Sequence, residues 1–413
     1  MGLDIAVIGA GIVGMCCAAY LRRDGHRVTV LDPVAPGGSC SFGNLGSLSP
    51  GSCVPLATPG ILTKIPRMLV EGDRALSVAP ARALAAAPWL ARFVAAARPA
   101  RVAAAAKALS ALHSRVFEAY APLLAWADAN DLVRRAGQLY VFESESDFAH
   151  ARFELDLRRA HGERQETIDG DEIRQLEPAL AAGFARGVFL PDAGHCIEPK
   201  RLVELLAAAL VRDGGMILPE RVNHVAVDAG KVVLTIDHGV HRADRVIIAS
   251  GAWSNRLLQL LCAEVPLESL RGYHAVLRNC GATPRMAIRF ARAKIMATPM
   301  ATGLRVGGTV EIAGLDAPPT PGRARKLAAL GAKVFPGADP NDFSEWMGHR
   351  PGTPDSLPVI GALRRHPAVY CAFGHGQTGL TGAASTGELI AAIIGGRNPP
   401  IDAAPYSPRR FGA

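Results

Sequence analysis

Three glycines at a fixed spacing stand near the start of the chain, in the run GAGIVG at residues 9–14. This G-x-G-x-x-G pattern is typical of a turn that binds the pyrophosphate of a dinucleotide. Gly9 would make the tight turn, Gly11 would leave room for the phosphates, and Gly14 would let the next helix pack on the strand. Ile12 and Val13 open that helix, whose free N–H groups and positive dipole end would face the phosphates.

A carboxylate stands where a dinucleotide-binding unit needs one to hold ribose hydroxyls. Asp32 ends a second apolar run, and residues 4–32 read as strand, glycine turn, helix and strand. An acid at this position favours a free ribose and disfavours a 2′-phosphate, so we do not expect NADP. From these residues alone NAD and FAD both remain, and a glycine-rich turn without a ligand is the simpler alternative.

Two other stretches are rich in glycine and small polar residues. Residues 33–60 form a long segment of Gly, Ser and Pro, and such segments in compact proteins usually serve a site. A second strand, glycine turn and helix follow at residues 369–394, with the turn in GHGQTGLT (374–381). A second turn of this kind predicts a cofactor too long for one strand–helix–strand unit.

The composition limits the class of protein. The 413 residues are 49% hydrophobic and 20% charged, which is ordinary for a globular chain. The net charge is +8, but no basic run marks a nucleic-acid arm, so we expect no nucleic-acid partner. The eight cysteines lack metal-site spacing, and we expect reduced thiols and no metal. The first strand begins at once and no long apolar run follows, which predicts a cytoplasmic protein without a signal peptide.

The order of predicted elements indicates an α/β fold with a second sheet. Residues 74–130 read as two or three alanine-rich helices carrying arginines, either packed with a solvated basic face or resting on anionic lipid. Residues 265–312 read as successive antiparallel strands. We therefore expect a discontinuous Rossmann-like domain (residues 1–73, 195–260 and 340–413) with an inserted mixed or antiparallel-sheet substrate domain (residues 74–194 and 261–339).

Several motifs together resemble a known family, the FAD-dependent D-amino acid oxidase and dehydrogenase superfamily. The similarity is greatest to the bacterial D-amino acid dehydrogenases and D-hydroxyproline dehydrogenases. It rests on the glycine unit extended to Asp32, on SFGNLGSLSPG (41–51), RGYHAVL (271–277) and RVGGTVEIAG (305–314), and on GHRPGTPDSLPVIG (348–361) with FGHGQTGLTGAASTGELI (373–390).

The resemblance implies an FAD-binding set that extends beyond the glycine unit. The family's middle cofactor contacts fall on Ser41, Asn44 and Gly46, its adenine-side contact on Val222, and a contact near the pyrophosphate on Gly251. Backbone groups at the second turn would border the flavin ring, where a helix N-terminus stabilises negative charge. The matching positions there are Gly374, Gly376, Thr378, Gly379, Leu380 and Thr381.

The substrate-binding residues match the family less well. An amino acid carboxylate is best bound by an arginine fork, and the dehydrogenases often carry an arginine where this chain has Pro299. Arg350 and Tyr273 match family positions and remain as candidates, with His349 beside them. Arg305 is a weaker candidate, because strand alternation can point it away. Pro299 also suggests a pocket altered for a small or cyclic amino acid.

The resemblance implies oxidation of a D-amino acid, such as D-proline or D-hydroxyproline, to the imino or 2-oxo acid. Electrons would pass to a quinone or another carrier, and the basic helices would allow peripheral contact with the cytoplasmic face of the inner membrane. Two alternatives stay open. One is an oxygen-using amino acid oxidase or an L-specific relative, and the other is an NAD-dependent dehydrogenase or a non-catalytic flavin-binding module.

Overall fold

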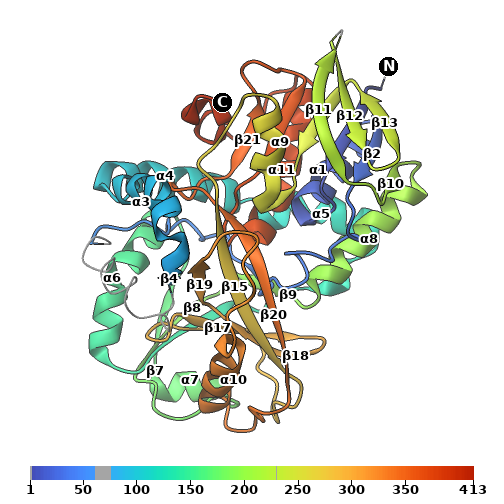
Figure 1. The fold of residues 1–413 in the computed structure, drawn as a ribbon. Helices are drawn as coiled ribbons and strands as arrows, with labels where there is room; N and C mark the ends of the chain where they lie inside the picture. Colours follow the sequence, from blue (N-terminus) through green and yellow to red (C-terminus); the bar gives the residue numbers. More distant parts are fainter. Residues whose placement is uncertain (1, 61–75, 229) are drawn as a thin grey trace.

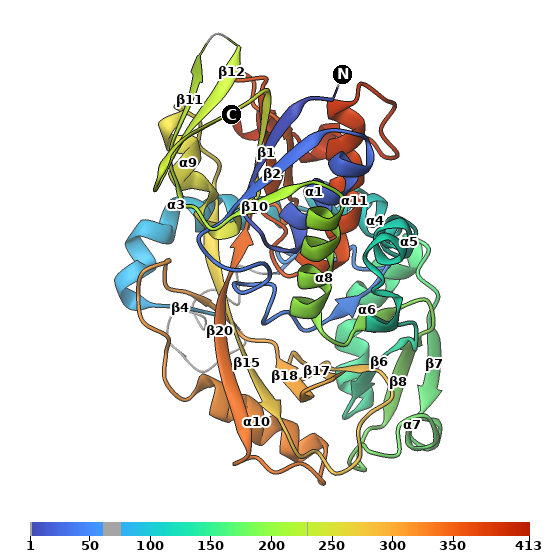
Figure 2. The same ribbon diagram turned by 90° about the vertical axis from the view of Figure 1, so that its right-hand side faces the viewer.

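The computed structural model describes residues 2–60, 76–228 and 230–413. Two large sheets organise them, one above the other in the view of Figure 1. Both chain termini lie beside the upper sheet. The long strands β15 (Glu268–Leu277) and β20 (Phe343–Gly352) run through the lower sheet. Figure 2 shows the same two layers from the side.

The upper sheet is the Rossmann-like part, and its central strands are buried on both faces. Five strands are parallel, and the edge strand β21 pairs antiparallel with β22. The parallel strands are rich in Val and Ile along their whole length, which is typical of parallel strands covered on both sides. In spatial order the strands are β10 (Met216–Leu218), β2 (Arg27–Leu31), β1 (Asp4–Ile8), β14 (Arg245–Ile248), β22 (Val369–Phe373) and β21 (Val359–Ala362).

Helices from distant parts of the chain cover one face of this sheet. The helix after the first glycine turn lies directly against the helix after the second, and three more pack around the pair. These five helices are α1 (Ile12–Arg23), α11 (Gly379–Ile394), α8 (Pro199–Arg212), α4 (Pro99–His113) and α5 (Val116–Ala127). Helix α9 (Ser254–Leu260) and a three-stranded sheet pack over the other face; its strands are β11 (Val222–Asp228), β12 (Lys231–Ile236) and β13 (Gly239–Ala243).

The lower sheet has ten strands and is mixed, as the sequence predicts. Its order is β4 (Leu76–Val78), β19 (Val310–Ile312), β15, β18 (Gly303–Gly307), β17 (Ile295–Met300), β16 (Ala287–Phe290), β6 (Gln138–Phe142), β8 (Arg186–Leu190) and β7 (Glu166–Asp169), with β20 paired to β15. Helix α10 (Arg323–Val334) packs on one face through an apolar cluster that includes Leu139, Ala275 and Ala297. Residues of the opposite face, such as Met296 of β17, line a cavity between the two sheets.

Smaller elements connect the two sheets. A short sheet joins β3 (Ser47–Leu48), β9 (Gly194–Cys196) and β5 (Val133–Arg134). Three further helices are α3 (Ala83–Ala96), α6 (Glu145–Ala160) and α7 (Gly170–Leu176). None of the helices within the described ranges is long and apolar enough to cross a membrane.

The fold class predicted from the sequence is confirmed, including three helices between residues 83 and 127. The expected domain limits stay a prediction. The limit between residues 73 and 74 lies outside the described residues, and α4 and α5, expected in the substrate domain, pack on α11 and α8 of the Rossmann-like part. Strand β13 was not anticipated, because its sequence GVHRA is polar and exposed.

Candidate functional site

A cavity of about 2250 Å³ lies between the two sheets. Drug-sized ligands usually occupy sites of roughly 300–1,000 Å³, so this one has room for a dinucleotide and a second molecule. The carboxyl ends of β1, β2, β14 and β22 open into it, together with the segment 33–60. Ligands bind at this edge in doubly wound folds.

The three glycines of the first turn play different structural roles. A Cβ on Gly9 would lie 2.5 Å from the carbonyl oxygen of Ala249, and the residue has φ +117°. A Cβ on Gly14 would overlap the carbonyl oxygen of Gly9, so this position sets how closely α1 packs on β1. A Cβ on Gly11 would meet only the Ser41 hydroxyl, at an ordinary 3.5 Å. Gly11 therefore faces open space in the cavity, where a phosphate fits.

The start of α1 and the end of β2 close this part of the cavity. Ile12 and Val13 line it, and the backbone N–H of Ile12 donates to the Ser41 hydroxyl at 2.9 Å. The Asp32 carboxylate accepts the N–H of Ala10 at 2.7 Å and that of Val34 at 2.8 Å. Asp32 thus holds the glycine turn and the following loop at the position where a ribose would lie.

Segment 33–60 lines the middle of the cavity, as its composition predicts. Ser41 and Asn44 both reach the cavity wall. Gly46 does not: it has φ +74°, and a Cβ there would lie 2.4 Å from the carbonyl oxygen of Cys196. This corrects the expectation for Gly46, whose role is to turn the chain beside β9, where Asn44 Oδ1 accepts its N–H at 2.8 Å.

The remaining expected contacts come from the second half of the chain. Val222 and Gly251 line the cavity from β11 and from the turn after β14. The second glycine turn lines it along its length, through Gly374, Gly376, Thr378, Gly379, Leu380 and Thr381. Helix α11 begins here with no capping side chain, so its first N–H groups point toward the cavity. The structure therefore brings both helix N-termini to one cavity.

His375 lies within this second turn and is buried. Its Nε2 is 2.8 Å from the Thr386 hydroxyl, and that hydroxyl donates to the carbonyl oxygen of Gly382. The His375 Nε2 is therefore the donor in the first bond. Burial lowers the pKa of His375 to about 3, with the neighbouring His113 adding to the effect. His375 is neutral and fixes the shape of the turn.

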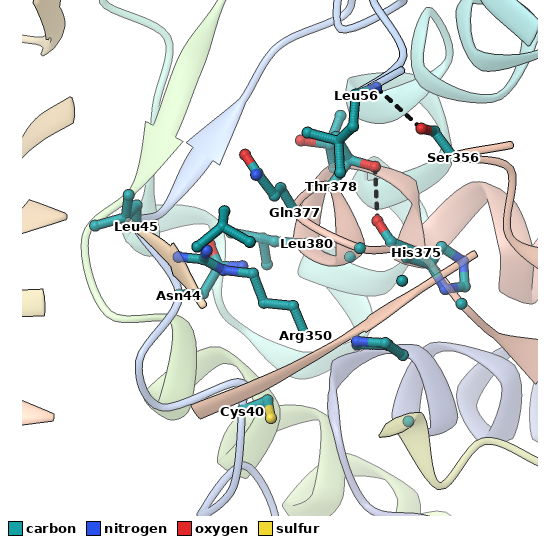
Figure 3. A pocket seen from close by; sticks show the side chains of 18 of the residues that line it. Cys40, Asn44, Leu45, Leu56, Arg350, Ser356, His375, Gln377, Thr378 and Leu380 are labelled. Carbon is teal, nitrogen blue, oxygen red and sulfur yellow. Dashed lines mark hydrogen bonds between the residues drawn. The ribbon is translucent and has the colours of Figure 1, made fainter. Parts of the chain in front are cut away.

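Arg350 extends from β20 into the cavity (Figure 3). Its guanidinium crosses above β15, where a Cβ on Gly272 would lie 2.2 Å from the Arg350 Cζ. Its Nη1 donates to the carbonyl oxygen of Thr309 at 3.0 Å. Among the described residues no carboxylate lies within ion-pair distance of it, and burial lowers its pKa to about 10. Arg350 is a half-buried cation with donors left for an anion.

His349 lies beside Arg350 and also lines the cavity. Its Nδ1 is 2.8 Å from the Ser269 hydroxyl, and its ring stands edge-on to Trp253 at 5.3 Å. Burial lowers its pKa, with Arg271 adding to the effect, so the ring is neutral at pH 7. The Cys40 thiol donates to the His349 carbonyl oxygen at 2.9 Å, which joins the loop to β20.

Two expectations about substrate-binding residues are corrected by strand alternation. Tyr273 lies outside the cavity, in the cluster under α10; its hydroxyl donates to Glu311 at 2.7 Å and accepts the N–H of Thr320. Pro299 pairs with Leu304, and its neighbour on the same face of β17, Ala297, packs under α10. An arginine at position 299 would face away from Met296, which does line the cavity. Pro299 therefore gives no information about the shape or specificity of the substrate pocket.

Arg305 does not line the cavity either, but alternation is not the reason: it pairs with Thr298, on the same face of the sheet as Met296. Its Nη1 donates to the carbonyl oxygens of Phe42 and Asn44, at 3.0 Å and 2.6 Å, so it holds the loop.

A polar wall of the cavity was missed by the sequence reasoning. Residues of β6, β16 and α6 form it: Gln138, Tyr140, Glu154, Arg158 and Arg289. Arg289 lies 3.3 Å from Glu154, and its guanidinium lies over the Tyr140 ring. The run QLYVF predicts a strand, but nothing local shows that the face with Gln138 and Tyr140 meets a cavity.

These features define a dinucleotide-binding protein of the Rossmann type, in which a second sheet forms the other side of the cavity. The family model of FAD dependent oxidoreductases matches residues 4–393, and the chain belongs to this family. It is 36% identical to a D-amino-acid oxidase of Bradyrhizobium diazoefficiens over 99% of both chains. It is 32% identical to a D-amino acid dehydrogenase of Xanthobacter autotrophicus, again over 99% of both.

The fold agrees with solved structures. Glycine oxidase from Geobacillus kaustophilus superposes with a TM-score of 0.77 at 21% identity, over 98% of each chain. The cofactor is thus FAD, and NAD is excluded as the alternative. The residues fit it: there is space at Gly11, and two helix N-termini face one cavity. When bound, FAD supplies the two-electron acceptor of the reaction.

Proposed function

We propose that the protein oxidises a D-amino acid, with Arg350 binding the substrate carboxylate. The observation that carries the proposal is the half-buried Arg350 guanidinium, which has no carboxylate partner among the described residues and lies in the cavity lined by both glycine turns. Keeping a cation buried without a counter-ion is costly, and a carboxylate ligand offsets that cost. The names of the full-length relatives support an amino acid as the anion.

The chain's own contribution is orientation and shielding from water. An arginine fork bound to the carboxylate fixes the substrate Cα atom relative to the cofactor. Holding the reacting atoms in this way contributes much of an enzyme's rate acceleration. The Thr309 carbonyl holds the guanidinium in place. His349 and His375 are neutral, so neither competes with Arg350 for the anion, and neither is assigned as a base.

The substrate and acceptor are proposed in finer terms from the resemblance. We propose D-proline or D-hydroxyproline as substrates, and a quinone or another carrier as acceptor. Relatives named as an oxidase and as dehydrogenases leave oxygen as the competing acceptor. The test is a screen of D- and L-amino acids, including both hydroxyprolines, with an artificial acceptor and then with oxygen. Preference for L-isomers, or reduction of oxygen alone, would overturn the respective part.

Contact with a membrane surface is a separate part of the proposal. Helix α3 leaves Leu84 88% exposed; Arg92, two turns further along the helix, and Arg98, just after its end, are exposed as well. An exposed leucine with nearby cations suits the boundary of an anionic bilayer. The protein should sediment with phosphatidylglycerol vesicles at low salt and be released by physiological salt. Absence of binding at low salt would leave α3 as an ordinary packing helix.

A further inference from the structure

Gln377 is the polar side chain of the second glycine turn whose hydrogen-bonding groups are left over. It lines the cavity, its side chain is exposed, and its amide has no partner among the described residues. The other polar side chains of the turn are engaged. The Thr378 hydroxyl donates to the carbonyl oxygen of His375 at 3.1 Å, and the His375 ring bonds within α11. The Thr381 hydroxyl donates to the carbonyl oxygen of Ser47 at 3.0 Å.

Backbone hydrogen bonds fix Gln377 beside the strand that carries Arg350. Gly352, at the end of β20, forms an isolated antiparallel bridge with His375. The N–H of the residue after His375 donates to the carbonyl oxygen of Pro351 at 2.8 Å. Counted from this bridge, Gln377 is two residues along one chain and Arg350 is two residues back along the other. The two residues therefore start from neighbouring backbone segments, about 5 Å apart.

The two side chains leave a space between them. Strand β15 pairs with β20 on the edge opposite the bridge, and the Arg350 guanidinium leans toward β15, above Gly272. Gln377 comes from the other edge, and Figure 3 shows both side chains extending into the cavity. Within the described part of the chain no hydrogen bond joins them. A small molecule can therefore contact both.

This arrangement suits the two polar groups of an α-amino acid. The carboxylate and the amine are bonded to the same Cα atom, so a group that contacts the amine must lie a few ångströms from the carboxylate clamp. An amine offers N–H donors and needs an acceptor. The side-chain oxygen of a glutamine is such an acceptor, whereas the arginine fork has donors only.

We propose that Gln377 Oε1 accepts a hydrogen bond from the substrate's α-amino group while Arg350 binds the carboxylate. This proposal rests on the proposed function. Holding one N–H of the amine fixes rotation about the Cα–N bond, and the two contacts together orient the hydrogen on Cα. An amide oxygen does not take up the proton, so Gln377 binds and positions the substrate and is not a base.

The test uses two ligands that cannot be oxidised, because neither carries a hydrogen on Cα. They are 2-aminoisobutyrate and pivalate, which differ by an amino group in place of a methyl group. Titration of the flavin absorbance of the FAD-loaded enzyme gives the Kd of each. Gln377→Leu removes the acceptor and keeps a similar size. We expect the Kd of 2-aminoisobutyrate to rise about tenfold and that of pivalate to stay unchanged.

Gln377→Glu keeps an acceptor and adds a negative charge. It should bind 2-aminoisobutyrate at least as tightly, because the ammonium group then faces a carboxylate, and it should bind pivalate more weakly, because like charges repel. A purely structural role of Gln377 would move both ligands together. Gln259→Leu is the matched control: Gln259 is exposed on α9 and lies outside the cavity lining, so both Kd values should be unchanged.

Three outcomes in Gln377→Leu would overturn the amine contact. They are an equal loss for both ligands, no loss for either, and loss of FAD at an unchanged melting temperature, which would place the amide against the cofactor. Arg350→Lys tests the proposed function separately, because it should weaken both ligands. If it weakens neither, the carboxylate clamp fails, and the contrast in Gln377→Leu still decides the amine contact. Binding of neither ligand by the wild-type enzyme would overturn both proposals.

Discussion

Replacing Arg350 with lysine tests the substrate site most directly. The substitution keeps a positive charge and removes the planar fork that matches a carboxylate. Among the described residues the guanidinium has one hydrogen-bond acceptor, the Thr309 carbonyl, which leaves its other donors for the proposed substrate. The variant isolates geometry from charge.

The expected loss of activity follows from the hydrogen bond of the fork that lysine cannot make. Losing one charged hydrogen bond in a bidentate pair costs about 1.5–3 kcal/mol. At about 1.4 kcal/mol per tenfold, kcat/KM should fall by about one to two orders of magnitude. A larger share should appear in KM if the fork binds the ground state and transition state equally.

The assay is steady-state reduction of an artificial acceptor, with flavin content measured on the same preparation. Arg115→Lys is the control: Arg115 binds the Glu388 carboxylate and lies outside the cavity lining. It should keep kcat/KM near the wild-type value. Loss of FAD from Arg350→Lys would place Arg350 against the cofactor, and near-normal turnover would make it structural. Either result would refute the carboxylate clamp.

Four further outcomes are expected from the same site. Gly11→Val should purify folded, because a Cβ at this position makes only an ordinary contact with protein atoms. It should lack FAD, because the side chain fills the space for the phosphates, and full flavin content by absorbance would contradict this. Gly14→Ala should instead lower the melting temperature, since its Cβ would overlap the Gly9 carbonyl oxygen, and an unchanged value would count against close packing of α1 on β1. Burial lowers the pKa of Arg350 to about 10, so kcat/KM should decline as pH rises through about 10 and Arg350 loses its proton; a flat profile there argues against a charged clamp. FAD should be released by acid precipitation, although the Cys40 thiol lines the cavity; colour kept by the precipitate, and lost in Cys40→Ser, would show a covalent link.

Local pattern was enough to predict the dinucleotide half of the molecule. The surroundings of the three glycines, Gly9, Gly11 and Gly14, agree with what their spacing predicts. This was possible because the strand, the turn and the start of the helix are adjacent in sequence. The second glycine turn was predictable for the same reason. That the two turns share one cavity depends on the parallel order β1–β14–β22, which brings residues 248 and 371 into register.

The substrate half depended on information that no short stretch contains. Tyr273 and Gly272 are neighbours on β15, yet Gly272 lies under the Arg350 guanidinium and Tyr273 packs under α10. Strand alternation predicts two faces but does not say which of them meets the cofactor. That choice is made by α10, which covers the face of Tyr273 with Leu327 and Ala328.

Arg350 and Arg305 differ in what their guanidiniums bind, and this difference makes Arg350 available to the proposed substrate. Arg305 is buried and Arg350 is half-buried, and burial lowers the pKa of each to about 10. Arg305 binds two carbonyl oxygens of the loop at Phe42 and Asn44, and it therefore stabilises the wall of the cofactor region. Arg350 crosses Gly272, where no side chain blocks it, and uses one carbonyl. A glycine at position 272 is thus part of the proposed substrate site, because any Cβ there would clash with the Arg350 guanidinium.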